Sequence, residues 1–356
     1  MKKNQLILGL VVLAALVGLA VYGQHRHPFD FHAFGEQFKA ADWRLIALGL
    51  GCIYLGYVFR GIRWALLIRH SKKVPLFSLL GTQVIGFTAV ALTGRVADLV
   101  RPYLVSKKAG LSIGSQFAVY VVERLFDAGS MGLIFSSVIL LAPAGALPHP
   151  EVFRKFGYWG IAGTLAGALF LAAIRVAGEV VAAVMERIFG LISKGLGHSI
   201  GEKIRSFRAG LDTLRSPADF LIALGLSLGM WGLITVAYVE TARAFVASPQ
   251  LASLTLAQGM VLMVSSGVAS VIQLPVLGWF TQIYAVAATL GKLFNVSAES
   301  ATACAATLLL VTFLGIIPLG LIWARVEHVS LKKISEESEQ AGVGELTEPI
   351  ADQAAL

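Results

Sequence analysis

Charged side chains are concentrated between Thr93 and Asp127, in a chain that is otherwise apolar. Arg95, Asp98 and Arg101 are spaced i, i+3 and i+6, so on a helix neighbouring members share a face and the carboxylate is flanked by two guanidinium groups. Such a series keeps one net positive charge and several free N–H donors. A planar guanidinium group can hold two phosphate oxygens at once. These residues are therefore candidates for binding a phosphate-bearing ligand.

A second charged group follows at the start of a long apolar run. Glu123 and Asp127 are i, i+4 neighbours, and Arg124 can reach Asp127 at i+3. Two acids that face each other in a low-dielectric site can share one proton, which suits proton coupling. The same acids can instead serve as counter-charges for the arginines, because structural ion-pair networks also perturb protonation. The sequence leaves both interpretations open.

A third group consists of Arg60, Arg63 and Trp64, in which Arg60 shares a helical face with the other two. Arginines that extend to water beside an interfacial tryptophan are ordinary membrane anchors. Alternatively, Arg60 and Arg63 add positive charge to the candidate ligand site.

Hydrogen-bonding residues without formal charge form a fourth group in the second half of the chain. They surround the tip of a predicted helical hairpin and comprise Gln273, Pro275, Gly278, Trp279, Thr281 and Gln282. Irregular backbone at membrane depth persists only where it is buried in protein or lines water. A packed Gly/Pro kink without a ligand is the alternative.

The composition indicates an integral membrane protein. Hydrophobic residues make up 56% of the chain and charged residues 14%, with a mean hydropathy of +0.76. A charged residue at the centre of a spanning helix costs roughly 2.5 to 3.5 kcal/mol, so the charged groups must be paired or hydrated. The net charge of +8 fits basic loops that meet anionic lipid better than it fits nucleic-acid binding.

Neither metal nor cofactor chemistry is predicted. Cys52 and Cys304 lie in apolar runs, where buried cysteine behaves as a small hydrophobic residue. The seven histidines are scattered through loops and ends, without a helix-borne metal pair or a nucleophile and base. We therefore expect no cofactor and no metal site.

The apolar runs predict an all-α polytopic membrane protein. A helix needs about 20 residues to cross a bilayer. Six runs approach or exceed this length: Gln5–Tyr22, Leu45–Ile68, Phe117–Leu141, Tyr158–Val176, Phe220–Val239 and Ala301–Ala324. Two others, Leu76–Thr93 and Leu254–Leu274, run into glycine or proline and are predicted to be the first arms of re-entrant hairpins. Eight full crossings are the alternative.

The distribution of basic residues predicts the orientation. All basic clusters can face the cytoplasm only if 76–104 enters and leaves the membrane on one side. Residues 5–142 and 158–325 then repeat one order of elements in opposite orientations, which is a recurrent transporter architecture. We expect both termini in the cytoplasm and a multi-pass protein of a bacterial inner membrane or its equivalent.

This interpretation gives one transmembrane domain, 1–328, and two segments outside the membrane. Residues 179–215 alternate apolar and charged side chains at helical spacing and predict an amphipathic helix on the cytoplasmic surface. Residues 329–356 are acidic, without a sustained apolar pattern, and are predicted to be a disordered tail.

The charged groups resemble a pattern in the flippase-like family named for the transmembrane region of lysylphosphatidylglycerol synthases. That pattern, Arg-x-Gly-Glu-x-x-Arg, a basic linker and Glu-Arg-x-x-Asp, is similar to 95–101, 107–110 and 123–127 here. The resemblance extends from about Trp43 to Trp323. It implies movement or presentation of a lipid across the bilayer, with aminoacyl-lipid synthesis confined to a separate soluble domain. The hydrophilic segments between the spans, at most about forty residues long, are too short for such a domain.

Two departures from the family pattern concern its acids. The family's Gly-Glu is replaced by Ala97-Asp98, which shortens the acidic side chain. The second-half motif Pro-Gly-Gly-x-Gly-x-x-Glu begins here at Pro275 and ends at Gln282, without its acid.

The leading hypothesis is a non-enzymatic lipid translocase. Arg95 and Arg101 would bind the headgroup, Asp98 would orient them, and the group 123–127 would line or gate the route. The alternatives are a membrane enzyme or enzyme subunit acting on a phospholipid or polyprenyl phosphate, and a membrane scaffold. The expected partner is a phosphate-bearing lipid and not a nucleic acid; a homo-oligomer or a partner enzyme is left open.

Overall fold

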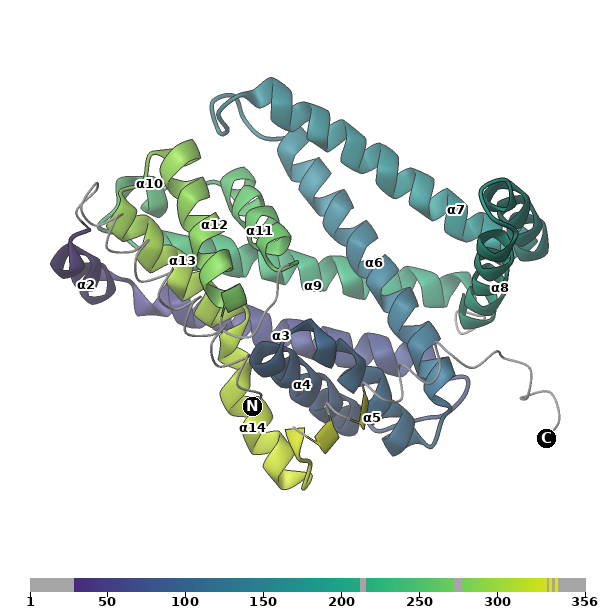
Figure 1. The fold of residues 1–356 in the computed structure, drawn as a ribbon. Coiled ribbons are helices and arrows are strands. Elements are labelled where there is room, and N and C mark those ends of the chain that lie inside the picture. Colours follow the sequence, from purple (N-terminus) through teal and green to yellow (C-terminus); the bar gives the residue numbers. More distant parts are fainter. Residues whose placement is uncertain (1–28, 212–215, 272–276, 332, 335–336, 339–356) are drawn as a thin grey trace, which may run out of the picture.

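The computed structural model describes residues 29–211, 216–271, 277–331, 333–334 and 337–338. Within these ranges the chain is helical and contains no strand, which confirms the all-α prediction (Figure 1). The predicted first span, Gln5–Tyr22, lies outside them. The helices are α2 (Phe31–Ala40), α3 (Trp43–Ile68), α4 (Leu76–Thr93), α5 (Val100–Ala109), α6 (Ile113–Leu140), α7 (Pro150–Gly190), α8 (Lys194–Leu211), α9 (Pro217–Arg243), α10 (Pro249–Ala252), α11 (Leu256–Ala269), α12 (Leu277–Phe294), α13 (Ala298–Thr312) and α14 (Ile317–Val326).

Several helices are long and apolar enough to cross a membrane. They are α3, α4, α7 and α9, and the pair α13 and α14, bent by 41°, can form a fifth span. This confirms a polytopic membrane protein. The predicted span Phe117–Leu141 lies in α6, a helix of 28 residues. This helix is not among the candidate spans by length and composition, because its first half carries charged side chains.

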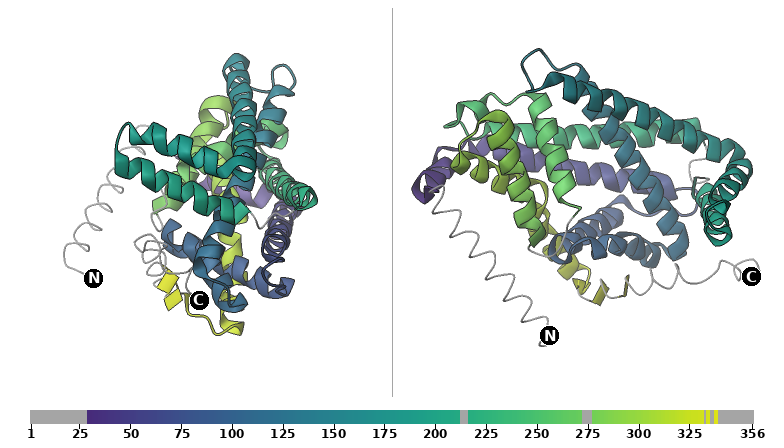
Figure 2. Two further views of the ribbon diagram at one scale, coloured as in Figure 1. Left: turned by 90° about the vertical axis from the view of Figure 1, so that its right-hand side faces the viewer. Right: turned by 45° about the horizontal axis from the view of Figure 1, so that its top comes forward.

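Helices α3 and α9 run antiparallel along the long axis of the molecule (Figure 2). Gly49 near the start of α3 lies against Thr241 near the end of α9, and Arg63 near the end of α3 donates to Ser227 of α9. The absence of a side chain at Gly49 lets the two backbones approach closely. The antiparallel pair is the arrangement that an inverted repeat requires, and the repeat itself stays a prediction.

The first predicted hairpin folds as two antiparallel helices. Helix α4 ends at Gly94, whose φ of 86° favours glycine, and a 3₁₀ turn, Arg95–Leu99, leads into α5. Helix α5 then returns along α4, because Arg101 lies beside Gly86 and Lys108 reaches the carbonyl of Ser78. Helix α4 alone is long enough to span a membrane, so eight crossings remain an alternative.

The second predicted hairpin also consists of two packed helices, α11 and α12. The Ser265 hydroxyl lies 2.8 Å from the Thr289 hydroxyl and donates to the carbonyl of Ala285 at 3.1 Å. Residues 272–276, between these helices, lie outside the described residues, and so do the predictions for Gln273 and Pro275.

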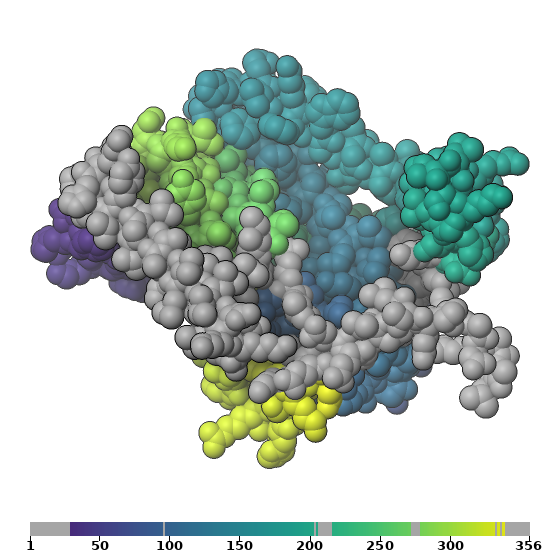
Figure 3. Space-filling model, in the orientation of Figure 1, coloured from purple at the N-terminus to yellow at the C-terminus, as the bar shows by residue number. Residues whose placement is uncertain are grey.

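Helices α7 and α8 project from the rest of the molecule (Figure 3). Non-helical dihedral angles at Ala177 interrupt α7, and α8 packs against its second half through ion pairs from Arg205 to Glu179 and Glu186. The segment predicted to be an amphipathic helix, 179–215, therefore divides between two helices. Large apolar side chains along α7, among them Trp159, are exposed, as on a helix that faces lipid.

The start of the predicted tail contacts α5 where it is described. Ile334 is buried with Tyr103 and Leu104, and Glu337 accepts a hydrogen bond from the Tyr103 hydroxyl. One apolar side chain and one carboxylate thus have partners on α5 that the composition of the tail does not reveal, and the disorder of 329–356 stays a prediction. Residues 339–356 lie outside the described residues.

Candidate functional site

Six charged side chains from three helices meet inside the bundle and form what we call the arginine cluster. Its members are Arg60 and Arg63 of α3, Arg101 of α5, and Glu123, Arg124 and Asp127 of α6. The side chains of Arg63, Arg101 and Glu123 are at most 1% exposed. The structure thus joins the first, second and third charged groups of the sequence into one site.

Glu123 is the centre of the cluster. Its Oε1 lies 2.8 Å from Arg63 Nη2, and its Oε2 lies 3.0 Å from Arg101 Nη1. Arg60 and Arg124 approach the same carboxylate at 3.7 and 3.6 Å. One buried carboxylate therefore holds four guanidinium groups together.

Asp127 is the second acid of the cluster. Its Oδ1 lies 2.7 Å from Arg63 Nη1, and its Oδ2 lies 3.0 Å from Arg124 Nη2 and 3.4 Å from Arg60 Nη1. The pairing of Arg124 with Asp127 at i+3 is confirmed. Because both acids are held by guanidinium groups, the geometry favours counter-charging over a proton shared between them.

The predicted pairing of Arg101 with Asp98 is wrong. Arg101 Nη1 donates to Glu123 and to Gln83 Oε1 at 3.1 Å, and no ion pair with the half-buried Asp98 occurs in the described structure. The 3₁₀ turn changes the helical spacing before Val100, and α4 and α6 cover the face on which Arg101 lies. The side chain of Arg95 lies outside the described residues.

The interfacial-anchor interpretation is also wrong for Arg63 and Trp64. Each is 1% exposed, and the Trp64 indole N–H donates to Gln116 Oε1 at 3.2 Å. Contacts from α6 and α9 enclose these side chains. They belong to the interior of the protein.

Aromatic rings hold three of the guanidinium groups in place. The Arg101 guanidinium carbon lies 4.4 Å from the Phe87 ring centroid and 5.3 Å from that of Tyr120. Arg60 lies over Phe87 at 4.8 Å, and Arg124 over Tyr120 at 5.2 Å. A ring face attracts a cation without consuming its N–H donors. The sequence does not single out Phe87 and Tyr120, because no local pattern distinguishes them from other apolar residues.

The cluster carries more positive charge and more donors than its own acids use. Its four guanidinium groups face two carboxylates, which leaves two positive charges in excess. The Nε atoms of Arg63 and Arg101, Arg101 Nη2 and Gln83 Nε2 are buried in the described structure without an acceptor. A buried polar group without a hydrogen-bond partner costs about 1 to 3 kcal/mol of stability. An anion that accepts hydrogen bonds from these donors would remove that cost. The Arg124 side chain is 38% exposed as a whole, but its Nε and Nη2 are also buried.

The described part of the fourth group is not joined to this cluster. Gly278 and Gln282 are buried, Trp279 and Thr281 are half-buried, and the Thr281 hydroxyl donates to the carbonyl of Gly278 within α12. No hydrogen bond or ion pair links these four residues to the arginine cluster in the structure as described. Their role as a second binding group stays a prediction.

Metal-ligating residues are dispersed in the described part of the chain. No group of three histidine, cysteine, aspartate or glutamate residues there could hold a metal ion. Cys52 and Cys304 are buried and unpaired.

Replacing Gly86 by alanine is expected to disturb the cluster. A Cβ at Gly86 would overlap Arg101 Cγ, so the Arg101 side chain would have to move away from Glu123. We expect a lower unfolding temperature in detergent, measured by tryptophan fluorescence. Gly129→Ala in α6 is the matched control, because nothing lies within 4 Å of its Cβ position and alanine favours a helix. Equal unfolding temperatures for the two variants would contradict the close approach.

Comparison with known proteins identifies a family. A family model described as the lysylphosphatidylglycerol synthase TM region matches residues 6–320. No curated protein and no solved structure matches the chain. The matched range includes every residue of the arginine cluster.

Proposed function

The chain belongs to the family of lysylphosphatidylglycerol synthase transmembrane regions, and on this premise we propose that it is a non-enzymatic lipid translocase whose arginine cluster binds a phosphate-bearing headgroup. The family relates the chain to phospholipid handling in a membrane. The finer assignment is supported by the chemistry of the cluster.

One observation carries the proposal: a buried site with an excess of positive charge and unused N–H donors inside a membrane protein. Arg101 directs one nitrogen at Glu123, while its Nε and Nη2 have no acceptor. A phosphate group offers several acceptor oxygens and the compensating negative charge. Arginines inside a membrane protein are costly and typically mark ion or substrate pathways.

The cluster also lowers the barrier that keeps a headgroup out of the hydrocarbon. An anionic group that leaves water must exchange its hydration for protein donors and opposite charge. The side chains of Arg124 and Arg60 are 38% and 11% exposed, and that of Arg101 is fully buried. Such a gradient of accessibility supports passage of the headgroup rather than a purely structural ion pair.

We further propose a multi-pass protein of the bacterial inner membrane, with both termini in the cytoplasm. The support is the concentration of lysine and arginine in the segments that share one side under the hairpin topology.

The test is headgroup-resolved translocation in proteoliposomes. Wild type is compared with Arg95→Ala/Arg101→Ala, and Arg44→Ala/Arg154→Ala, at two exposed arginines, is the matched control. We expect wild type and control to move one class of anionic lipid and the Arg95→Ala/Arg101→Ala variant to move none. Wild-type movement by this double variant would overturn the proposed site. No movement of any lipid by folded wild type would favour an enzyme subunit or a scaffold.

A further inference from the structure

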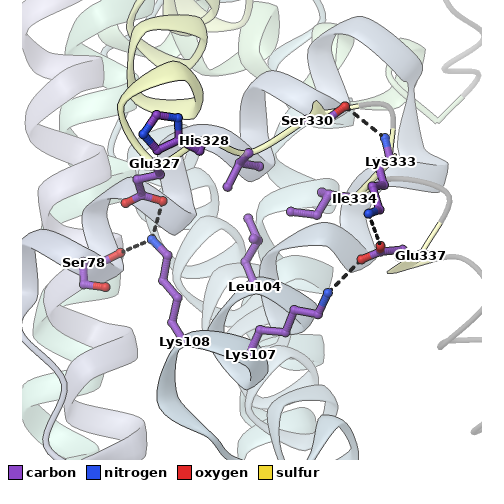
Figure 4. A pocket seen from close by; sticks show the side chains of 11 residues that line it. Ser78, Leu104, Lys107, Lys108, Glu327, His328, Ser330, Lys333, Ile334 and Glu337 are labelled. Carbon is purple, nitrogen blue, oxygen red and sulfur yellow. Dashed lines mark hydrogen bonds and ion pairs between the residues drawn. The ribbon is translucent and has the colours of Figure 1, made fainter.

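A second basic site lies at the far end of α5, outside the arginine cluster. It is a pocket of about 670 Å³ between the start of α4, the end of α5 and the chain that follows α14 (Figure 4). Its polar lining consists of Ser78, Lys107, Lys108, Glu327, His328, Ser330, Lys333 and Glu337. The three lysines face two carboxylates, so the pocket is basic.

Several donors in this pocket converge on one carboxylate. Glu337 Oε2 accepts from Tyr103 Oη at 2.7 Å and from Lys107 Nζ at 2.8 Å, and Lys333 Nζ lies 3.9 Å from Oε1. Figure 4 shows Lys107 and Lys333 directed at Glu337 from opposite sides. The hydrogen bond from Lys107 holds the pKa of Glu337 below its ordinary value, so the carboxylate is ionised at neutral pH.

The third lysine of the pocket, Lys108, pairs with the other acid. Lys108 Nζ contacts Glu327 Oε2 at 2.5 Å and the carbonyl of Ser78 at 3.4 Å, and the Trp323 indole N–H donates to Glu327. Both acids of the pocket thus belong to the segment that leaves α14, whereas Lys107 and Lys108 belong to α5. The segment supplies negative charge to a basic surface that the hairpin provides.

We propose that this pocket binds a phosphate-bearing anion and that the Glu337 carboxylate is an intramolecular occupant which the anion displaces. A phosphate group presents more acceptor oxygens and more charge than a carboxylate, so it can take the Tyr103, Lys107 and Lys333 donors together. The Lys107–Glu337 pair is open to exchange, because the two side chains are 57% and 29% exposed and exposed pairs are weak.

The pocket and the arginine cluster share helix α5 but not their residues. Arg101 faces the cluster, while Leu104 and Lys107 line the pocket. The inference does not depend on translocation, and its test measures binding alone.

The test uses the full chain in detergent and isothermal titration calorimetry. One probe is inorganic phosphate and the other is a short-chain phosphatidic acid, so that a soluble anion and a lipid headgroup are distinguished. Glu337→Gln removes the occupant's charge, and Lys107→Gln removes the principal cation. Glu202→Gln and Lys155→Gln, at exposed positions outside the pocket, are the matched controls.

We expect Glu337→Gln to lower the dissociation constant of a probe about twofold to fivefold. This range corresponds to the free energy of one exposed ion pair, which the probe no longer has to break. Lys107→Gln should weaken binding of the same probe, and the controls should match wild type. Binding of both probes indicates a site for the phosphate group itself, and binding of phosphatidic acid alone indicates a lipid headgroup. The proposal is overturned if Glu337→Gln does not bind either probe more tightly, or if Lys107→Gln binds as well as wild type.

Discussion

Glu123→Gln is expected to destabilise the protein by about 3 to 5 kcal/mol, the usual cost of removing one partner from a buried ion pair. Glu123 is 1% exposed and lies within 4 Å of four arginines. Its neutralisation leaves Asp127 as the sole acid of the arginine cluster. Thermal unfolding in detergent, followed by tryptophan fluorescence, measures the effect.

Two further variants make this prediction specific. Glu151→Gln, at an exposed position in the first turn of α7, should unfold close to the wild-type temperature. Glu123→Gln/Arg124→Gln removes one positive charge as well and should recover part of the loss, since the two residues belong to one network. A Glu123→Gln variant as stable as wild type would show that this carboxylate does not hold the cluster together.

Arg101→Lys is expected to reduce lipid translocation at least about tenfold, which corresponds to about 1.4 kcal/mol in the barrier. Lysine keeps the positive charge but lacks the planar, forked arrangement of N–H donors of the guanidinium group. It cannot at once contact Glu123 and Gln83 and lie over the rings of Phe87 and Tyr120 as the guanidinium group does. The initial rate of headgroup-resolved translocation in proteoliposomes measures the effect.

The stability of Arg101→Lys separates binding from folding. Because the charge beside Glu123 is retained, we expect this variant to lose less stability than Glu123→Gln. Arg44→Lys, an exchange at an exposed arginine of α3, is the matched control and should translocate at the wild-type rate. Wild-type translocation by Arg101→Lys would mean that point charge suffices and that the fork geometry plays no part.

Local pattern and composition were sufficient for much of the fold. Mean hydropathy and run lengths determined the all-α polytopic class, because crossing a bilayer sets the length and polarity of a helix. The glycine at Gly94 determined where the first hairpin turns, and the i+3 spacing determined the pairing of Arg124 with Asp127. These features depend on residues close together in the chain.

Tertiary packing decided how the charged groups are partnered. Arg101 turns to Glu123 instead of Asp98, Arg63 is buried instead of exposed at an interface, and Glu337 folds back onto α5. Each outcome depends on which helix covers which face, and that is set by contacts between residues far apart in sequence. The sequence by itself therefore determined that this membrane protein carries an unusual concentration of charge, and only the tertiary structure decided that the arginines outnumber the acids within one buried site.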